Sequence, residues 1–294
     1  MTTSAINIKD YLKEIQQQSD ILLDKYLPSV ELEPKILHEA MRYSVMAGGK
    51  RLRPILAYSA YEYCGGSDFA DNAPISFAMP ALEMVHTYSL IHDDLPCMDD
   101  DDLRRGLPTC HKKFDEATAV LAGDALHDVA FELLAKTGSV EVIAELAHAI
   151  GTFGMIGGQI ADVEAEGKDV TADDVILIHT RKTGALLRAS VRIGAILAGA
   201  NDKNLEKLSI YGAKIGLAFQ IIDDILDIEG DQEVLGKAVG ADSDHQKATY
   251  PKAVGLDKAR EDAQKLIRDA NALFDDKEDN ILKHIANYIA QRKM

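Results

Sequence analysis

Residues 82–106 read LEMVHTYSLIHDDLPCMDDDDLRRG, an apolar segment that runs into six aspartates and two arginines. Two bare carboxylates about 4 Å apart repel by roughly 4 kcal/mol at an effective dielectric constant of 20, so a positive partner is expected. Asp93 and Asp99 would lie about 120° apart around a straight helix. Pro96 stands between them and removes a backbone donor. We therefore predict that the helix kinks or ends between Leu95 and Met98.

Outside this stretch, apolar residues recur at intervals of three and four along most of the chain, which predicts an all-α protein. Short separators rich in Gly and Asp join the helices, and no polar linker divides the chain. Residues 1–294 are therefore predicted to form a single domain, one large helical bundle. The expected helices lie near 4–27, 33–47, 53–64, 74–95, 115–136, 140–165, 172–199, 203–229, 251–274 and 278–291.

The chain has 32 basic and 48 acidic side chains, a formal net charge of −16. Nucleic acid and anionic membrane surfaces are therefore not expected as partners. The three cysteines show no CxxC spacing, and the sequence begins without a basic segment followed by an apolar run. No stretch was expected to cross a membrane, which takes about 20 apolar residues. These features predict a cytoplasmic protein without a membrane span.

A second acidic cluster, QIIDDILDIEGD, occupies residues 220–231. Asp223 and Asp227 are four residues apart, so on a helix they share a face and could share a cation. Asp224 lies about 100° round that helix and is the weaker candidate. Carboxylates supplemented by water and substrate phosphates suit Mg²⁺. The alternative is a solvated acidic face, which the flanking isoleucines disfavour.

Basic residues gather in short loops. The segment AGGKRLRP, residues 47–54, places Lys50, Arg51 and Arg53 after two glycines and before Pro54, a pattern typical of a diphosphate site at a helix start. No P-loop or kinase signature is present. Two carboxylate clusters and several basic loops suggest two diphosphates in one helical cavity, one of them a leaving group whose departure creates a carbocation.

The ordered motifs GGKRLRP, the opening stretch, LAGDAL, GGQ, KTG, FQIIDDILD, LGK and KATYP resemble those of the trans-isoprenyl diphosphate synthases, most closely the bacterial farnesyl diphosphate synthases. The match runs from about residue 30 to the end of the sequence. The resemblance implies the isoprenoid synthase fold, with about ten core helices around a deep central cavity. It also implies a homodimer, Mg²⁺, and head-to-tail condensation of isopentenyl diphosphate with dimethylallyl and then geranyl diphosphate.

The resemblance also implies roles for individual residues. Magnesium ligands would be Asp93, Asp99, Asp223 and Asp227, and cationic contacts of the allylic diphosphate would be Arg104, Lys182, Lys237 and Lys247. The isopentenyl diphosphate site would comprise Lys50, Arg53, His86 and Arg105, while Thr183 and Gln220 would stabilise the allylic cation. The implied reaction is metal-assisted ionisation of the allylic diphosphate, attack by the isopentenyl double bond, and proton loss to the departing diphosphate.

Product length can be predicted from the segment before Asp93. Tyr88 precedes Asp93 by five residues, about 7.5 Å along a helix, which is roughly one isoprene unit. Ser89, one turn before Asp93, is small, so the ring of Tyr88 would form the floor of the cavity. In enzymes that the chain resembles, an aromatic residue here accompanies the fifteen-carbon product, farnesyl diphosphate.

Several alternatives remain at the level of the sequence. A geranylgeranyl diphosphate synthase shares every motif except, usually, this aromatic residue. A terpene cyclase needs no isopentenyl site, and a non-catalytic regulatory subunit of a prenyl synthase usually loses one Asp motif. A simple divalent-ion binding protein would be expected to show a calcium-loop spacing, which is absent.

Overall fold

The computed structural model describes residues 7–67, 69, 72–229, 247–275 and 279–291. Two compact units are present. The N-terminal unit comprises Leu12–Ile55 and Asp68–Ile143, and the C-terminal unit comprises Met1–Tyr11, Leu56–Ser67 and Ala144–Met294. The prediction of a single domain stays a prediction, and each unit is described by itself.

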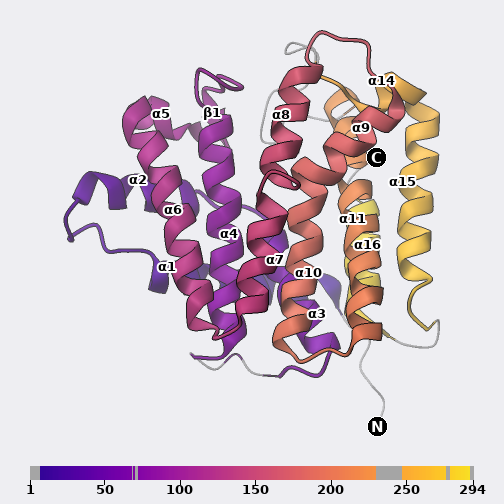
Figure 1. Cartoon of the computed structure of the whole chain (residues 1–294), viewed down its shortest axis with the longest axis horizontal. Helices are drawn as coiled ribbons and strands as arrows, with labels where there is room; N and C mark the ends of the chain where they lie inside the picture. The colour runs from indigo at the N-terminus through magenta and orange to yellow at the C-terminus, as the bar shows by residue number, and fades with distance from the viewer. Residues whose placement is uncertain (1–6, 68, 70–71, 230–246, 276–278, 292–294) are drawn as a thin grey trace. The chain divides into compact units, whose positions relative to one another are not determined.

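Helices make up most of the N-terminal unit (Figure 1). The long helix α4 packs along α6, and both contribute to its core. Burial on nearly every side explains why the sequence of α4 is apolar almost throughout. The helices with residues in this unit are α1 (Ile8–Tyr26), α2 (Lys35–Met46), α3 (Leu52–Tyr63), α4 (Pro74–Asp93), α5 (Cys110–Lys113), α6 (Glu116–Lys136) and α7 (Val140–Ile150).

The predicted interruption before Asp99 is confirmed, because α4 ends at Asp93, two residues before Leu95. The chain then turns through Pro96, and the backbone N–H of Asp99 donates to the carbonyl of Asp93 at 2.8 Å. Since the helix ends here, residues that would lie on different faces of a straight helix have adjoining backbones.

A short hairpin follows, which the all-α prediction missed. Strand β1 (Leu103–Arg104) pairs antiparallel with β2 (Leu107–Pro108). The two turn residues, Arg105 and Gly106, have φ values of 54° and 77°. Positive φ at both central residues is typical of the type I′ turn that matches strand twist. The Arg-Gly pair at the end of the opening stretch was the available signal.

The C-terminal unit is also helical. Its longest helix, α11, packs against α10 and α15, and Tyr211 on α11 donates a hydrogen bond to the carbonyl of Leu282 on α16 at 2.7 Å. The remaining elements are α8 (Met155–Ala165), α9 (Ala172–His179), the π-helix η1 (Thr180–Gly184), α10 (Ala185–Leu197), α11 (Asp202–Glu229), α14 (Tyr250–Val254), α15 (Leu256–Asn271) and α16 (Ile281–Ala290).

Three predicted helices differ in detail from the structure. The segment 140–165 is two helices, separated by the glycine-containing residues 151–154. The segment 251–274 is divided at Gly255, whose φ of 87° a helix cannot contain. The segment 172–199 holds a π-helical turn, η1, between α9 and α10. Such turns often occur at functional sites.

Two glycines allow neighbouring helices to approach η1 closely. A Cβ on Gly158 of α8 would lie 2.2 Å from the backbone nitrogen of Lys182. A Cβ on Gly216 of α11 would lie 2.9 Å from the Cα of Gly184. Since real Cβ atoms do not come this close to backbone, both helices can contact η1 only without a side chain at these points.

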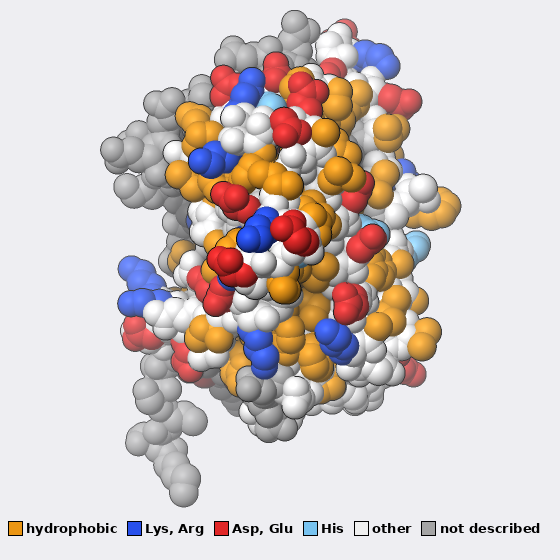
Figure 2. All heavy atoms as spheres, turned by 90° about the vertical axis from the view of Figure 1, so that its left-hand side faces the viewer, with side chains coloured by type: hydrophobic (Ala, Val, Ile, Leu, Met, Phe, Trp, Pro, Cys, Tyr) orange, Lys and Arg blue, Asp and Glu red, His pale blue; other side chains and the backbone are white. Residues whose placement is uncertain are grey.

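The surface drawn in Figure 2 carries Lys and Arg, Asp and Glu, and hydrophobic side chains interspersed with one another. This face therefore has no segregated basic patch of the kind that contacts nucleic-acid phosphates.

One stretch of the described residues, Val140–Ala165, passes a length and composition test for a membrane-spanning helix. A single such stretch is weak evidence, because core helices of soluble proteins pass the same test. The absence of a membrane span stays a prediction.

Replacing Gly158 by Ala is expected to lower the free energy of unfolding by about 1–3 kcal/mol, because the added methyl group meets backbone rather than a flexible side chain. The matched control is Gly184→Ala, whose Cβ would lie 3.3 Å from the carbonyl oxygen of His179. Urea denaturation measures both. Equal losses in the two variants would contradict the close-packing account.

Candidate active site

The two aspartate motifs lie in different units, so the candidate residues of each unit are described separately. In the N-terminal unit, Asp93 and Asp99 are partly exposed and their backbones are joined by the hydrogen bond that closes the turn after α4. Partly exposed carboxylates suit a hard cation that keeps several waters. Their role as magnesium ligands stays a prediction.

Asp94, between these two, has a different environment. Its side chain is buried, and its Oδ1 accepts a hydrogen bond from Arg104 Nε at 2.9 Å. Arg104 also contacts Asp101 Oδ2 at 2.9 Å. Burial raises the pKa of Asp94 to about 6, although the guanidinium of Arg104 opposes this rise. Asp94 therefore holds the predicted diphosphate contact Arg104 in place.

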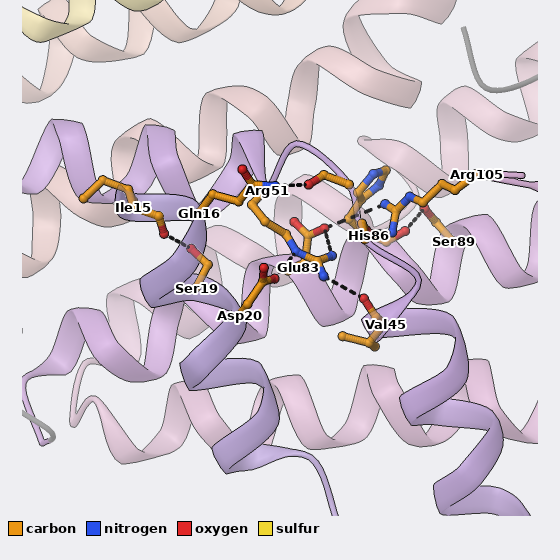
Figure 3. A network of polar contacts seen from close by, with 12 residues as sticks. Ile15, Gln16, Ser19, Asp20, Val45, Arg51, Glu83, His86, Ser89 and Arg105 are labelled. Carbon is orange, nitrogen blue, oxygen red and sulfur yellow. Dashed lines mark hydrogen bonds and ion pairs between the residues drawn. The ribbon is translucent and has the colours of Figure 1, made fainter. Parts of the chain in front are cut away.

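The glycine loop before α3 ends in a buried arginine, Arg51 (Figure 3). Arg51 is 2% exposed, and its guanidinium contacts Asp20 Oδ1 at 2.8 Å and Glu83 Oε1 at 2.9 Å. By contrast, Lys50 is exposed and Arg53 partly exposed. The three cations that the sequence grouped together therefore separate into a buried structural residue and two more accessible ones.

Arg105 closes this loop from the hairpin. Its guanidinium donates to the carbonyl of Gly48. It also lies so close to Gly49 that a Cβ there would be 2.8 Å from the Cζ of Arg105. From α1, Gln16 Nε2 donates to the carbonyl of Gly49 at 2.8 Å. The φ of 125° at Gly49 favours glycine, and a side chain there would also displace the guanidinium of Arg105.

His86 stands among these guanidinium groups. Burial, followed by the positive charges of Arg53 and Arg105, holds the pKa of His86 well below its usual range. The imidazole is therefore neutral at pH 7 and could donate or accept one hydrogen bond at each nitrogen. The structure brings together Arg53, His86 and Arg105, three of the four residues predicted for the isopentenyl diphosphate site.

Tyr88 lies two residues further along α4 than His86. Its ring is 7% exposed and makes edge contacts with His92 and with His127 of α6, at centroid distances of 5.8 and 5.3 Å. Ser89 is partly exposed and its hydroxyl donates to the carbonyl of His86 at 2.9 Å. The ring of Tyr88 is therefore held between two helices of the N-terminal unit.

In the C-terminal unit, the predicted weak candidate Asp224 is the centre of a network. Its Oδ2 accepts from His179 Nε2 and from the backbone N–H of Tyr250, each at 2.8 Å. Its Oδ1 accepts from Gln220 Nε2 at 3.2 Å, and Gln220 Oε1 accepts from the Thr183 hydroxyl at 2.8 Å. Asp224 therefore links α9, η1, α11 and the start of α14.

The flanking aspartates differ in exposure. Asp223 is partly exposed, whereas Asp227 is 3% exposed. Among the residues that the structure describes, no group of three His, Cys, Asp or Glu side chains could hold a metal ion unaided. Magnesium is usually held by one or two carboxylates supplemented by water and substrate phosphates.

Lys182, on η1, has a carboxylate partner of its own. Its Nζ lies 2.5 Å from Asp162 Oδ2 on α8, and Asp162 is 7% exposed. Lys247 is partly exposed and lies three residues before Tyr250. Lys237 lies outside the described residues. The roles of these three lysines in binding stay predictions.

Sequence reasoning missed three buried acidic residues that organise the site, Glu83, Asp94 and Asp162, and it did not predict that Arg51 is buried. Glu83 could have been found, because a Glu between Leu82 and Met84 on an apolar helix needs a buried partner. Asp162 follows the GGQ motif by three residues, which gave no comparable signal.

Among known protein families, a model described as polyprenyl synthetase matches residues 34–289 of this chain. The farnesyl diphosphate synthase of Escherichia coli is 46% identical over 295 residues, covering 96% of this chain and 97% of that protein. A chloroplastic geranylgeranyl pyrophosphate synthase of Catharanthus roseus is 50% identical over 274 residues, covering 88% of this chain and 75% of that protein.

Solved structures of similar proteins also resemble this chain in fold. The crystal structure of a Helicobacter pylori geranyltransferase complexed with magnesium and isoprenyl diphosphate has a TM-score of 0.81 and 33% identity, covering 98% of both chains. An FPP/GFPP synthase from Zymomonas mobilis has a TM-score of 0.84 and 40% identity, covering 98% of this chain and 100% of that one. The similar chains therefore include proteins named for different products.

Asp224→Asn is expected to lower the free energy of unfolding by about 1–3 kcal/mol. The amide nitrogen of Asn would face one of the hydrogen-bond donors that now donate to the carboxylate, so that hydrogen bond would be lost. Asp223→Asn, the matched control one residue away, is expected to cause a much smaller loss, since Asp223 is partly exposed. Thermal and urea denaturation without added ligands would compare them. Equal stability of the two variants would contradict the central role of Asp224.

The neutral state of His86 predicts a pH dependence of stability. The unfolded chain takes up a proton at this residue near pH 6.5, whereas the folded chain resists it, so unfolding is favoured as the pH falls below about 6.5. Between pH 7 and 5 the unfolding free energy of the wild type should fall more steeply than that of His86→Gln, by up to about 1.4 kcal/mol per pH unit. Urea denaturation at a series of pH values measures both slopes, and parallel slopes would refute the assignment.

Proposed function

Because the chain belongs to the polyprenyl synthetase family and is a trans-prenyl diphosphate synthase, we propose that its product is farnesyl diphosphate. The substrates would be isopentenyl diphosphate with dimethylallyl and then geranyl diphosphate. The observation that carries the product length is the ring of Tyr88, buried five residues before Asp93 and packed against His127.

Binding of isopentenyl diphosphate is proposed at the glycine loop. Lys50, Arg53 and Arg105 would neutralise the diphosphate, and charge-assisted hydrogen bonds from guanidinium groups are the strong ones. His86, neutral at pH 7, would add a directional hydrogen bond rather than another charge. The diphosphate would thereby be held while its carbon chain stays free to react.

Binding of the allylic diphosphate is proposed at Arg104, Lys182, Lys237 and Lys247. Asp93, Asp99, Asp223 and Asp227 would hold Mg²⁺, which supplies charge neutralisation of the leaving diphosphate when bound. Thr183 and Gln220 would direct oxygen dipoles toward the developing allylic cation. The departing diphosphate is proposed to accept the proton released after carbon–carbon bond formation.

The competing product is geranylgeranyl diphosphate, and relatives named for that product match at similar identity. Tyr88 favours the shorter product, because a bulky ring limits the depth available to the growing chain.

A homodimer and a cytoplasmic location are further proposals from the family resemblance. Val120 and Leu121 on α6, 39% and 57% exposed, supply apolar surface that a dimer could bury.

Product analysis tests this proposal. The purified chain, incubated with Mg²⁺, isopentenyl diphosphate and dimethylallyl diphosphate, is expected to accumulate a fifteen-carbon diphosphate, and chelation of Mg²⁺ should abolish it. Chromatography of the dephosphorylated products measures chain length. A twenty-carbon main product would favour the competing function, and no Mg²⁺-dependent product would favour a non-catalytic subunit.

In the same assay, Tyr88→Ala is expected to form products longer than fifteen carbons, because removing the ring deepens the cavity by roughly one isoprene unit. Tyr88→Phe is the matched control and should keep the fifteen-carbon product, since it retains the ring. Its lost hydroxyl has no hydrogen-bond partner among the described residues. A Tyr88→Ala enzyme that still stops at fifteen carbons would remove Tyr88 as the floor.

A further inference from the structure

Glu83 is 1% exposed on α4 and faces the glycine loop (Figure 3). Its Oε1 lies 2.9 Å from Arg51 Nη1 and 3.9 Å from Arg105 Nη2. Its Oε2 is buried without a hydrogen-bond partner among the described residues. One carboxylate oxygen therefore contacts two cations, while the other remains an unpaired acceptor.

The contribution of this arrangement to the stability of the fold is unfavourable, so stability does not explain it. A buried carboxylate with one unpaired oxygen retains much of its desolvation cost, and two adjacent guanidinium groups repel each other. Burial lowers the pKa of Arg105; the carboxylate of Glu83 opposes this effect, and repulsion from Arg51 and Arg104 adds to it. A position that served packing only would be occupied more favourably by an apolar side chain, so the carboxylate points to a role in the site.

Both arginines determine the conformation of the loop. Arg51 has a φ of 49°, and its Nη2 donates to the carbonyl of Val45 at 2.8 Å. Arg105 has a φ of 54° and donates to the carbonyl of Gly48. Positive φ is unfavourable for both residues, so contacts must hold them there, and Glu83 is the carboxylate that they share.

We propose that Glu83 is a positioning residue of the isopentenyl diphosphate site, which holds Arg51 inward and Arg105 against the glycine loop. This inference rests on the proposed function of that loop. With Arg51 held inward, the neighbouring Lys50 and Arg53 are presented away from it. With Arg105 fixed against Gly49, its guanidinium is oriented before the substrate arrives, which reduces the entropy lost on binding.

Selectivity for one substrate distinguishes positioning from general stabilisation. Arg104, the proposed contact of the allylic diphosphate in this unit, is held by Asp94 and Asp101 rather than by Glu83. Loss of the Glu83 charge should therefore weaken isopentenyl diphosphate alone. A residue that only stabilised the fold would change both KM values or kcat without such a preference.

The test compares Glu83→Gln with the matched control Asp20→Asn, another isosteric loss of a carboxylate that contacts Arg51. Asp20 has a 41% exposed side chain and pairs with Arg51 alone in this cluster. In Glu83→Gln the KM for isopentenyl diphosphate should rise by about tenfold or more, while the KM for geranyl diphosphate changes less than about twofold. In Asp20→Asn both KM values should stay within about threefold of the wild type.

The proposal is overturned if folded Glu83→Gln keeps the wild-type KM for isopentenyl diphosphate, or if both KM values rise together. If Glu83→Gln fails to fold, Glu83→Asp carries the test, because it keeps the charge but shortens its reach toward Arg105. A selective rise in KM there supports the proposal, and failure of both variants to fold overturns it in favour of stability alone.

Failure of the proposed function is separable from failure of this inference. Wild-type enzyme that forms no condensation product would refute the proposed function. Calorimetric titration with inorganic diphosphate would then still compare the loop in wild type and Glu83→Gln. Binding that is at least about tenfold weaker in Glu83→Gln supports the role of Glu83, and equal or absent binding in both overturns it.

Discussion

A cation that is partly buried in a helical protein needs a negative partner within ion-pair distance, and this requirement organises the candidate site. Glu83 holds Arg51, Asp94 holds Arg104, and Asp162 holds Lys182. Each carboxylate is itself buried, so each pair is confined to one geometry rather than sampling many. Each of these three cations is therefore oriented by a buried carboxylate on a neighbouring segment of the same unit.

This requirement gives a physical reading of the strongly acidic composition. Part of the acidic excess in the opening stretch would bind metal, as Asp93 and Asp99 are proposed to do. Another part, including Asp94 and Asp101, instead contacts arginine. A count of charges cannot separate these roles, because neighbouring aspartates in one motif differ in burial and in partner. The turn after α4 creates the difference by directing adjacent residues to opposite environments.

Much of the fold followed from the sequence, since helical periodicity and separators located most helices of the isoprenoid synthase fold. The end of α4 was predicted from one proline and one spacing argument. The β1–β2 hairpin, the π-turn η1 and the division at Gly255 were missed, because each depends on a few backbone angles that periodicity does not encode. The sequence suggested which aspartates could be ligands, a prediction that stays open, whereas the buried carboxylates that hold the cations required knowledge of which helix faces meet.

Asp224 illustrates why the support was hidden. Helical spacing placed Asp224 off the face predicted for Asp223 and Asp227, but spacing could not indicate what Asp224 would contact instead. Its partners come from α9, from within α11 and from the start of α14, at sequence distances of 45, 4 and 26 residues. The residue predicted to be the weakest ligand therefore has hydrogen-bond partners on three helices. Where a motif repeats one residue type, its members can differ in role, because contacts with other helices and not the motif itself decide what each side chain meets.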